Sequence, residues 1–493
     1  MKTILKKLTL IPLFIIIFSC KQDDLYNTIG ESEDSSIYYT VKYDFVPDLD
    51  SSYPVEGYAP VDTNKYYRGN SVTVLPPEDL DKQNHSFSGW HNEVTGEEYP
   101  VGSEFIMGEE DVTLYAKWTP NPFGKPTVFA NVVGDGSAGG YFGDDSNSNN
   151  FKFICAKNSL TAITFPFGNV DSGFNTINKQ FDISETEVTN RVFKTVLQWA
   201  YNKGKFYHYS YGYYNSTLTY INSTEAKYGG KLLIRFSGSA ISFSNNKEFG
   251  LAAGLEDYPV TGVTLYGAIM FCNWLTEMFG YKNERVYTGI TKDSWDGFVK
   301  ADPDKKGYRL PADVEWEYAA RYIGSTIPID YPGSEETLGE GCLFYGKNSF
   351  YSDLTNDYFW TPGNYLSGAK TFCNNINPSG FNLEPAGKYY NDMVAVYNDY
   401  YVDVDTLISR TSALSKVGGT ADIIRAHNQL NLYDMSGNVW EWCYDDSSTN
   451  GPKGTLRGGS YKDDACKLRV ANKETKASDH SDNNIGFRLA KTR

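Results

Sequence analysis

The sequence predicts an α+β protein in which short strands and long loops outnumber a few helices. Three observations support this fold class. Only three segments repeat apolar residues at helical spacing, and Gly, Pro and Asn residues divide much of the remaining chain into short β-rich runs. Aromatic residues make up 15% of the chain, including 39 Tyr, and aromatic rings fit well on pleated sheets. The length of 493 residues exceeds the ~250–300 at which a single core stops growing, so we expect at least two domains.

The N-terminal segment is typical of an export signal. Three lysines precede the apolar run at residues 8–19, which is shorter than the ~20 residues that a membrane-spanning helix needs. The run ends in Ile-Phe-Ser-Cys, which resembles a bacterial lipobox and predicts lipidation of Cys20 after removal of residues 1–19. The alternative is an ordinary signal peptide in which Cys20 is incidental.

Residues 20–38 are acidic and aperiodic, as expected for a solvated tether. Their start, Lys-Gln-Asp-Asp at 21–24, resembles the tag that sends some lipoproteins to the outer face of the outer membrane. The alternative is that these four residues are ordinary polar residues of a tether and carry no targeting signal. We therefore expect a lipid-anchored protein of the outer membrane, exposed at the cell surface.

Residues 39–118 predict a small antiparallel β-module. Its strand-like runs lie at 40–46, 66–76, 87–99 and 111–118. The spacing of its Gly, Trp and Tyr residues resembles one internalin-type B-repeat, a β-grasp-like module that serves in its family as a spacer or adhesive unit. We expect Trp90 and Trp118 in its core. The Pro- and Gly-rich residues 119–150 predict a flexible linker.

The second domain is predicted to span residues 151–493 and to contain the three helices. The first ends at Gly204, and its apolar positions are Val192, Phe193, Val196, Leu197 and Ala200. The second is expected to begin after the cap Thr264 and to stop at Gly280. The third is a short helix that Pro311 opens, where its missing N–H is not needed.

This domain contains six ordered segments that match one known family, at residues 183–193, 258–275, 308–321, 431–442, 456–461 and 483–490. Together they resemble the formylglycine-generating enzyme (sulfatase-modifying factor) family, whose fold is a loop-rich variant of the C-type lectin fold. The resemblance implies the same loop-rich fold for this domain. Residues 322–430 match poorly and contain a Tyr- and Asp-rich segment at 389–405, which we interpret as an insertion.

The segment Asp-Met-Ser-Gly-Asn-Val-Trp-Glu resembles the family's structural calcium loop. The resemblance implies four ligands, which are Asp434, Gly437, Val439 and Glu441. Carboxylate and main-chain oxygens are the ligands that Ca²⁺ accepts, at ~2.3–2.6 Å. The alternative is a hairpin turn with two surface acids.

The family's oxidase chemistry needs a copper site that we do not expect here. In the family enzyme, two cysteines with four residues between them, just after a Gly-Gly-Ser-aromatic turn, hold Cu(I) and activate O₂ to oxidise a substrate cysteine. Residues 458–461 keep the turn, but Asp463 and Leu468 occupy the two cysteine positions and Cys466 falls between them. Soft sulfur ligands select Cu(I), and one thiolate cannot form the two-sulfur site.

Six cysteines remain after Cys20, and they allow up to three disulfides in an exported chain, with no connectivity fixed by their spacing. Cys272 matches a half-cystine of the family, but the position of its usual partner holds Leu489. We therefore expect Cys272 to be a buried free thiol.

The sequence leaves three functions open. The first is a surface lipoprotein whose family-like domain binds a protein or glycan ligand, without oxidase activity. The second is an active formylglycine-generating oxidase that acts on sulfatase cysteines, and the third is a structural subunit of an envelope assembly. The formal net charge of −16 argues against nucleic acid as a partner.

For the first function, we expect the ligand at the end of the domain that contains the family's substrate groove. A related family of retroelement-diversified binding proteins ends in a similar frame, and there this stretch binds the ligand. Alternatively, Trp440 belongs to the core and Arg469 is a buried hydrogen-bonding hub. The candidate residues are Trp440, Ser460, Tyr461, Asp463, Asp464, Cys466 and Arg469, with the polar stretch 473–483.

Overall fold

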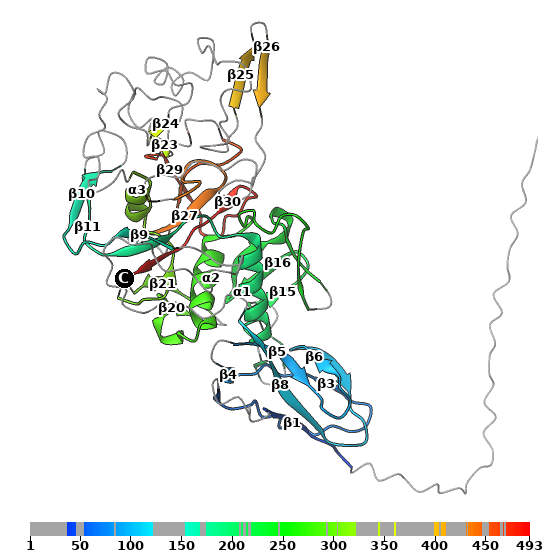
Figure 1. Ribbon diagram of the computed structural model, residues 1–493. Helices are drawn as coiled ribbons and strands as arrows, with labels where there is room; N and C mark the ends of the chain where they lie inside the picture. Colours follow the sequence, from blue (N-terminus) through cyan, green and yellow to red (C-terminus); the bar gives the residue numbers. More distant parts are fainter. Residues whose placement is uncertain are drawn as a thin grey trace, which may run out of the picture.

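The structure is a computed structural model of the chain. It describes residues 37–45, 54–82, 85–121, 153–167, 174–206, 209–210, 213–214, 218–244, 247–291, 294–302, 304–321, 344–345, 359–360, 399–403, 406–410, 430, 432–445, 453–463, 467 and 470–493. In this part of the chain most elements are short strands, and three are α-helices (Figure 1).

The N-terminal module is built on a four-stranded sheet with the order β1-β8-β5-β6. These strands are Val41–Asp44 (β1), Val112–Pro120 (β8), His85–His91 (β5) and Glu98–Tyr99 (β6). Short antiparallel pairs join Val55–Glu56 (β2) to Asp81–Lys82 (β4) and Ser71–Thr73 (β3) to Glu104–Ile106 (β7). The fully buried Trp90 packs edge-on against Tyr43, with ring centroids 4.8 Å apart. Trp90 therefore lies in the core, as predicted.

The prediction of an entirely antiparallel module is wrong for one pair of strands. β1 pairs with β8 in parallel, with Val41 opposite Val112. Parallel neighbours need a long crossover connection, and most of the module lies between these two strands. The local pattern of apolar residues does not reveal such a pairing.

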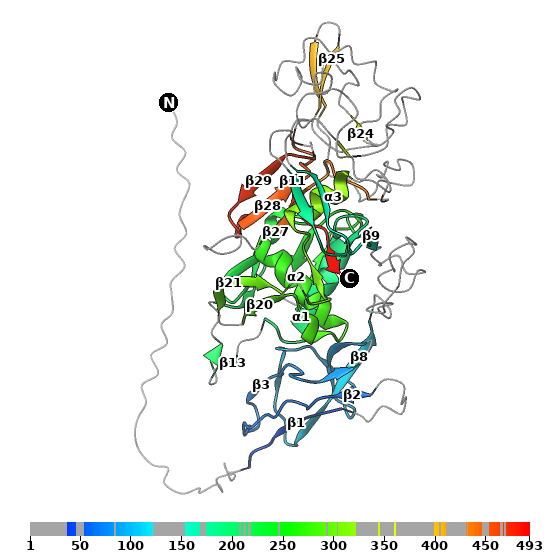
Figure 2. The ribbon, with the colours of Figure 1, turned by 90° about the vertical axis from the view of Figure 1, so that its left-hand side faces the viewer.

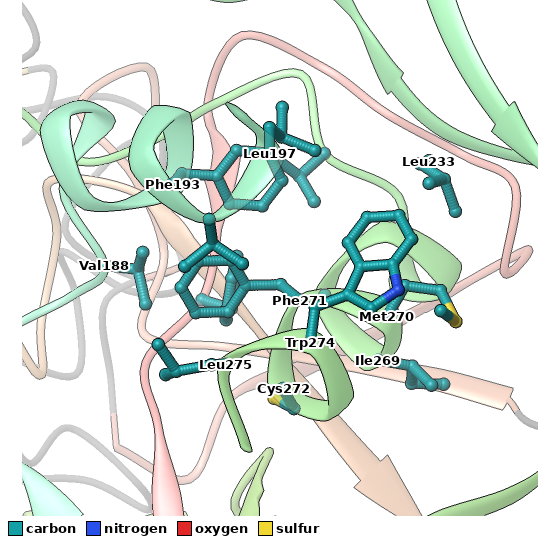
Figure 3. Close-up of a cluster of buried hydrophobic side chains, with 14 of the residues drawn as sticks. Val188, Phe193, Leu197, Leu233, Ile269, Met270, Phe271, Cys272, Trp274 and Leu275 are labelled. Carbon is teal, nitrogen blue, oxygen red and sulfur yellow. The ribbon is translucent and has the colours of Figure 1, made fainter. Parts of the chain in front are cut away.

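Two helices form the core of the second domain (Figure 3). They are Asn190–Asn202 (α1) and Leu265–Met278 (α2), and they begin after Thr189 and the predicted cap Thr264. Phe193 of α1 stacks on Phe271 of α2 with ring centroids 5.1 Å apart. Both helices end just before the predicted glycines, Gly204 and Gly280, which have φ angles of 69° and 82°.

The third helix, Asp313–Arg321 (α3), begins two residues later than predicted. Pro311 lies before the helix, where its carbonyl accepts a hydrogen bond from Tyr444 N at 3.0 Å. The side chain of Glu315 accepts from Ala312 N at 2.9 Å and so satisfies a free N–H at the start of the helix. The cap comes from this carboxylate, so Pro311 does not open the helix.

Two four-stranded sheets surround the helices. The first has the order β22-β31-β12-β9 and joins both ends of the domain. Its strands are Tyr308–Arg309 (β22), Ala490–Thr492 (β31), Phe181–Ser184 (β12) and Phe153–Lys157 (β9). The second has the order β29-β28-β27-β30 and carries the predicted ligand-binding stretch. Its strands are Lys473–Lys476 (β29), Lys453–Arg457 (β28), Trp440–Asp445 (β27) and Ile485–Gly486 (β30).

The remaining strands form pairs and one three-stranded sheet. They are Ile163–Pro166 (β10), Phe174–Ile177 (β11), Tyr209–Ser210 (β13), Tyr213–Tyr214 (β14), Tyr220–Ile221 (β15), Glu225–Tyr228 (β16), Lys231–Arg235 (β17), Ile241–Phe243 (β18), Phe249–Leu251 (β19), Tyr287–Ile290 (β20), Trp295–Ala301 (β21), Phe344–Tyr345 (β23), Phe359–Trp360 (β24), Asp399–Asp403 (β25) and Thr406–Arg410 (β26).

Of the predicted insertion at 389–405, the structure describes residues 399–403. The predicted signal segment, Cys20 and the predicted tether up to residue 36 lie outside the described residues. Among the helices that the structure describes, none has both the length and the apolar character needed to span a bilayer.

Candidate ligand-binding site

A tight turn before β27 positions the predicted calcium loop. Asp434, Gly437 and Asn438 have φ angles of 58°, 90° and 61°, a left-handed conformation that Gly, Asn and Asp tolerate best. Gly437 N donates to Gly458 O at 2.8 Å, and Tyr461 N donates to Asn438 O at 2.9 Å. These two bonds place the predicted calcium loop directly beside the Gly-Gly-Ser-Tyr turn that follows β28.

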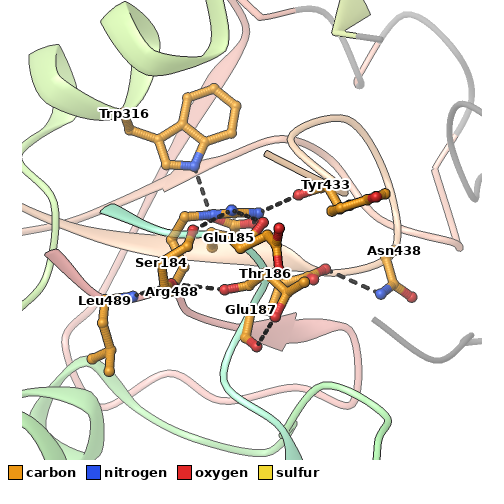
Figure 4. Close-up of polar contacts among 10 residues, drawn as sticks. Ser184, Glu185, Thr186, Glu187, Trp316, Tyr433, Asn438, Arg488 and Leu489 are labelled. Atoms are coloured by element: carbon orange, nitrogen blue, oxygen red, sulfur yellow. Dashed lines mark hydrogen bonds and ion pairs between the residues drawn. The ribbon is translucent and has the colours of Figure 1, made fainter. Parts of the chain in front are cut away.

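Glu441 forms a fully buried ion pair with Arg488, which follows β30. Figure 4 shows Arg488 together with Trp316 and Tyr433. Arg488 Nε and Nη2 donate to the two carboxylate oxygens of Glu441, each at 2.6 Å. The indole of Trp316 donates to Glu441 Oε2 at 2.7 Å, and Arg488 also donates to the carbonyl of Tyr433 at 2.8 Å. The ion pair therefore ties α3, β27 and the C-terminal segment together.

Glu187 is a third buried acid at this place, and sequence reasoning missed it. Its Oε1 accepts from Asn438 Nδ2 at 3.0 Å, and its buried Oε2 has no hydrogen-bond partner in the described part of the structure. Burial raises the pKa of Glu187 well above its ordinary value, and the charges of Asp434 and Glu441 raise it further. The only signal in the sequence was its position inside the matched segment 183–193.

These three acids and Arg488 form a cluster that carries excess negative charge when every carboxylate is ionised. Burial also raises the pKa of Glu441, against the opposing charge and hydrogen bonds of Arg488. A buried carboxylate needs a proton, a cation or hydrogen-bond donors to be stable. The described residues contain no group of three or more Asp, Glu, His or Cys side chains placed to hold a metal ion. A cation at this loop would therefore depend on main-chain carbonyls as well as side chains.

Asp463, which the sequence resemblance aligned with the family's first cysteine, is held by hydrogen bonds from buried neighbours. Trp440 Nε1 donates to Asp463 Oδ2 at 2.8 Å, and the hydroxyl of Ser460 donates to the same oxygen. Asn484 Nδ2 in turn donates to Ser460 Oγ at 2.9 Å. Burial raises the pKa of Asp463, while the bonds from Ser460 and Trp440 oppose the rise. The carboxylate thus fastens the turn to β27.

The predicted binding residues divide into a buried and an exposed group. Ser460 is fully buried and Trp440 is 3% exposed, in agreement with the core alternative for Trp440. Tyr461 is half-buried, and Asp482 of the predicted polar stretch 473–483 is exposed. Lys462, which was not among the predicted residues, is also exposed. Lys462 forms an ion pair with Asp482 at 3.1 Å, within the predicted polar stretch 473–483. Ligand contact at this face would therefore begin with the exposed group.

A buried arginine before the Gly-Gly-Ser-Tyr turn was also missed. The side chain of Arg457 is fully buried, and its guanidinium pairs with Asp313 and, at 2.9 Å, with Glu317 of α3. It also donates to the carbonyl of Val470 at 3.0 Å. An arginine just before a glycine pair gave no signal of this role. Its contacts fix the end of β28 and, through it, the start of the turn.

Three of the predicted site residues, Asp464, Cys466 and Arg469, lie outside the described residues. Within the described part, Cys155, Cys272 and Cys443 are free, and Cys272 is buried as predicted. Burial raises the pKa of Cys272 and of Cys443 well above the ordinary value of a thiol, which keeps both protonated and unreactive.

The chain belongs to the sulfatase-modifying factor enzyme 1-like domain family, whose model matches residues 164–493. The N-terminal module matches the Listeria-Bacteroides repeat domain over residues 39–117.

Curated relatives of this chain include two bacterial proteins. The chaperone protein LppX of Paenibacillus barcinonensis is 27% identical over 221 residues, which cover 42% of this chain and 60% of the relative. The formylglycine-generating enzyme of Streptomyces coelicolor is 40% identical over 81 residues, which cover 13% of this chain and 26% of the enzyme. The chain thus spans less than two thirds of the length of either relative. Among solved structures, CarF matches with a TM-score of 0.34 and 20% identity, covering 68% of this chain and 99% of CarF.

Proposed function

We propose that this protein is an envelope lipoprotein whose sulfatase-modifying-factor-like domain binds a ligand at the β27–β30 face and has lost the family's oxidase chemistry. The observation that carries the proposal is the environment of Asp463. The family's first thiolate is replaced by a carboxylate that accepts bonds from Trp440 and Ser460. An oxygen ligand committed to two donors is a poor substitute for sulfur on Cu(I).

A copper titration tests the loss of the redox site. Wild type, Asp463→Cys with Cys466→Ser, and a triple variant that adds Leu468→Cys to these two changes are titrated with Cu(I) against a competing chelator. The Cys466→Ser change prevents a new thiol pair between positions 463 and 466. We expect stoichiometric binding only in the triple variant, because it alone has both cysteine positions of the family. Tight stoichiometric copper binding by the wild type would contradict the proposal.

We further propose that the ligand is a protein. A relative named as a chaperone supports this choice over a glycan, because such a protein acts on another polypeptide. The exposed charges of Lys462 and Asp482 also suit polar protein contacts, although surface ion pairs alone contribute little affinity.

Crosslinking on intact cells followed by affinity capture tests this choice of ligand. The wild type is compared with Lys462→Glu, a surface change at the proposed face, and with Lys282→Glu, a distant surface lysine. Loss of one specific polypeptide in Lys462→Glu alone is the expected result. Retention on a glycan array, with no captured polypeptide, would favour the glycan alternative.

Calcium at the loop before β27 is part of the proposal. The ligands would be the carboxylate of Asp434, the carbonyls of Gly437 and Val439, and Glu441, whose Oε1 and Oε2 accept three hydrogen bonds in the structure. A carboxylate has about four lone-pair positions, so one remains for a metal. The excess of buried negative charge around Arg488 supports a cation here. When bound, calcium would supply charge neutralisation and rigidity to the loop.

The calcium test is thermal unfolding with and without EDTA. We expect EDTA to lower the melting temperature and added Ca²⁺ to restore it, with Mg²⁺ as the control cation. An unchanged melting temperature after EDTA treatment would overturn the calcium proposal.

The lipid anchor at Cys20 and the surface location are proposals that rest on the lipobox-like N-terminus. Metabolic labelling with a palmitate analogue should mark the wild type and not Cys20→Ala. Proteinase added to intact cells should then degrade the protein if it faces outward, while a periplasmic marker protein stays intact.

A further inference from the structure

The C-terminal end of α1 contacts the N-terminal repeat directly, and the end of α2 contacts the residue that follows the repeat's last strand. We call the residues involved, Tyr201, Lys203 and Gly204 with the carbonyl of Met278, the helix-end surface. Tyr201 OH donates to Val101 O at 3.4 Å, and Asn121 Nδ2, just beyond β8, donates to Met278 O at 3.4 Å. The end of α1 thus meets the repeat itself, and the end of α2 meets Asn121, the residue that directly follows β8.

Lys203 is the central polar contact of the helix-end surface. Its Nζ donates to Leu80 O at 2.5 Å and to Asp81 Oδ1 at 3.1 Å, both in the repeat. The Lys203 side chain is only 9% exposed, because the repeat covers it. A buried ammonium is stable only when carboxylate or carbonyl oxygens replace its water, and the repeat supplies both kinds of oxygen.

Gly204 permits the close approach of the two modules. It has a φ of 69°, and a Cβ atom placed on it would lie 2.2 Å from Cβ of Pro76 in the repeat. Gly280 occupies the corresponding position after α2, with a φ of 82°, and a Cβ there would meet nothing within 4 Å. The two glycines therefore share the same backbone conformation, but only Gly204 lies against the repeat.

We propose that the helix-end surface is a docking site for the repeat, so that the repeat and the sulfatase-modifying-factor-like domain form one rigid unit that unfolds cooperatively. A module joined only by a flexible linker would not need a buried lysine and a glycine shaped to its surface. The repeat then acts as a fixed support and not as a mobile spacer.

Docking also sets the direction in which the candidate face points. In both ribbon views the repeat lies at one end of the helices and the sheet containing β27 and β28 lies toward the other end (Figures 1 and 2). A chain anchored before the repeat would therefore present this face away from its anchor. This consequence rests on the proposed function, whereas the docking itself does not.

The test compares Gly204→Ala with Gly280→Ala in the purified full chain by scanning calorimetry and hydrogen exchange. Both variants strain a left-handed residue, so their difference reports the contact with Pro76. We expect wild type to unfold both modules in one transition. In Gly204→Ala, amides at 74–82 and 99–103 should exchange about tenfold faster than in Gly280→Ala, which corresponds to a modest loss of docking free energy.

A lysine pair provides a second comparison that does not depend on backbone strain. Lys203→Met removes the bonds to Leu80 and Asp81, whereas Lys205→Met removes a bond of 2.5 Å to Glu277 within the second domain. Faster hydrogen exchange of the repeat's amides in Lys203→Met, but not in Lys205→Met, supports docking. This comparison remains valid if the Gly204→Ala variant does not accumulate as a folded protein. Equal exchange in both lysine variants, or separate transitions of the two modules in wild type, would overturn it. Neither readout involves a ligand, so the proposed function can fail independently.

Discussion

Replacing Asp463 by Ala tests whether this carboxylate fastens the Gly-Gly-Ser-Tyr turn. The change removes the acceptor of the Trp440 indole, at 2.8 Å, and of the Ser460 hydroxyl. Trp440 is 3% exposed and Ser460 fully buried, so water cannot readily replace the lost acceptor.

The expected loss follows from these contacts. An unsatisfied buried donor costs about 1–3 kcal/mol, and the indole N–H bears this cost in full because its direction is fixed. The Ser460 hydroxyl can rotate to another acceptor, so it adds less. Burial disfavours the ionised carboxylate of Asp463, as its raised pKa indicates, so removing it offsets part of the lost stability. We expect a net decrease of about 2 kcal/mol in the free energy of unfolding.

The assay is urea unfolding at neutral pH, with Asp463→Asn as the matched variant. Asn keeps an acceptor oxygen of the same shape, so it should cost less than about 1 kcal/mol. The midpoint should shift while the slope with denaturant stays unchanged. An Ala variant within about 0.5 kcal/mol of wild type, or an Asn variant as damaging as Ala, would refute the reasoning.

Three further predictions concern charge and sulfur. The pKa of Asp463 is raised in the folded protein, so the contribution of this group to stability is fully present below its pKa in the unfolded chain and is lost as pH rises through its folded pKa. Asn does not titrate, so the stability of Asp463→Asn relative to wild type should increase as pH rises between these two pKa values. Unfolding measured from pH 3.5 upward checks this. Glu441→Gln leaves Arg488 buried without its charged partner and should lower the free energy of unfolding by about 3–5 kcal/mol. The control Glu474→Gln, at the partly exposed ion pair with Lys467, should lower it by less than about 1 kcal/mol. Equal decreases in the two variants would contradict these roles. Cys272 and Cys443 should react with a thiol reagent only after denaturation, as mass spectrometry of modified peptides would show, and rapid labelling of either one in the native protein would contradict their burial.

The sequence predicted the elements whose signals are local. Apolar spacing identified α1 and α2, and Thr264, Gly204 and Gly280 marked their limits because caps and left-handed stops act within one turn of the helix. The start of α3 was misplaced by two residues: the helix begins at Asp313, and Glu315 accepts from the N–H of Ala312, which lies between Pro311 and the helix.

Contacts between distant segments could not be predicted in this way. The parallel pairing of β1 with β8 and the buried cluster of Glu187, Glu441 and Arg488 join parts of the chain that no local pattern relates. Gly204 was recognisable as a helix stop, but its contact with Pro76 depends on how the repeat sits against the helix. The resemblance located the two loops of the candidate site, and only the structure revealed which side chains hold them together.

The central claim is that the family's oxidase chemistry is absent from this domain. The most direct measurement incubates the purified protein with Cu(I), O₂ and a peptide containing Cys-x-Pro-x-Arg, and follows the peptide by mass spectrometry beside the Streptomyces coelicolor formylglycine-generating enzyme. We predict an unmodified cysteine with this protein and formylglycine with the enzyme. Formation of formylglycine by this protein, at a rate that depends on copper, would contradict the account.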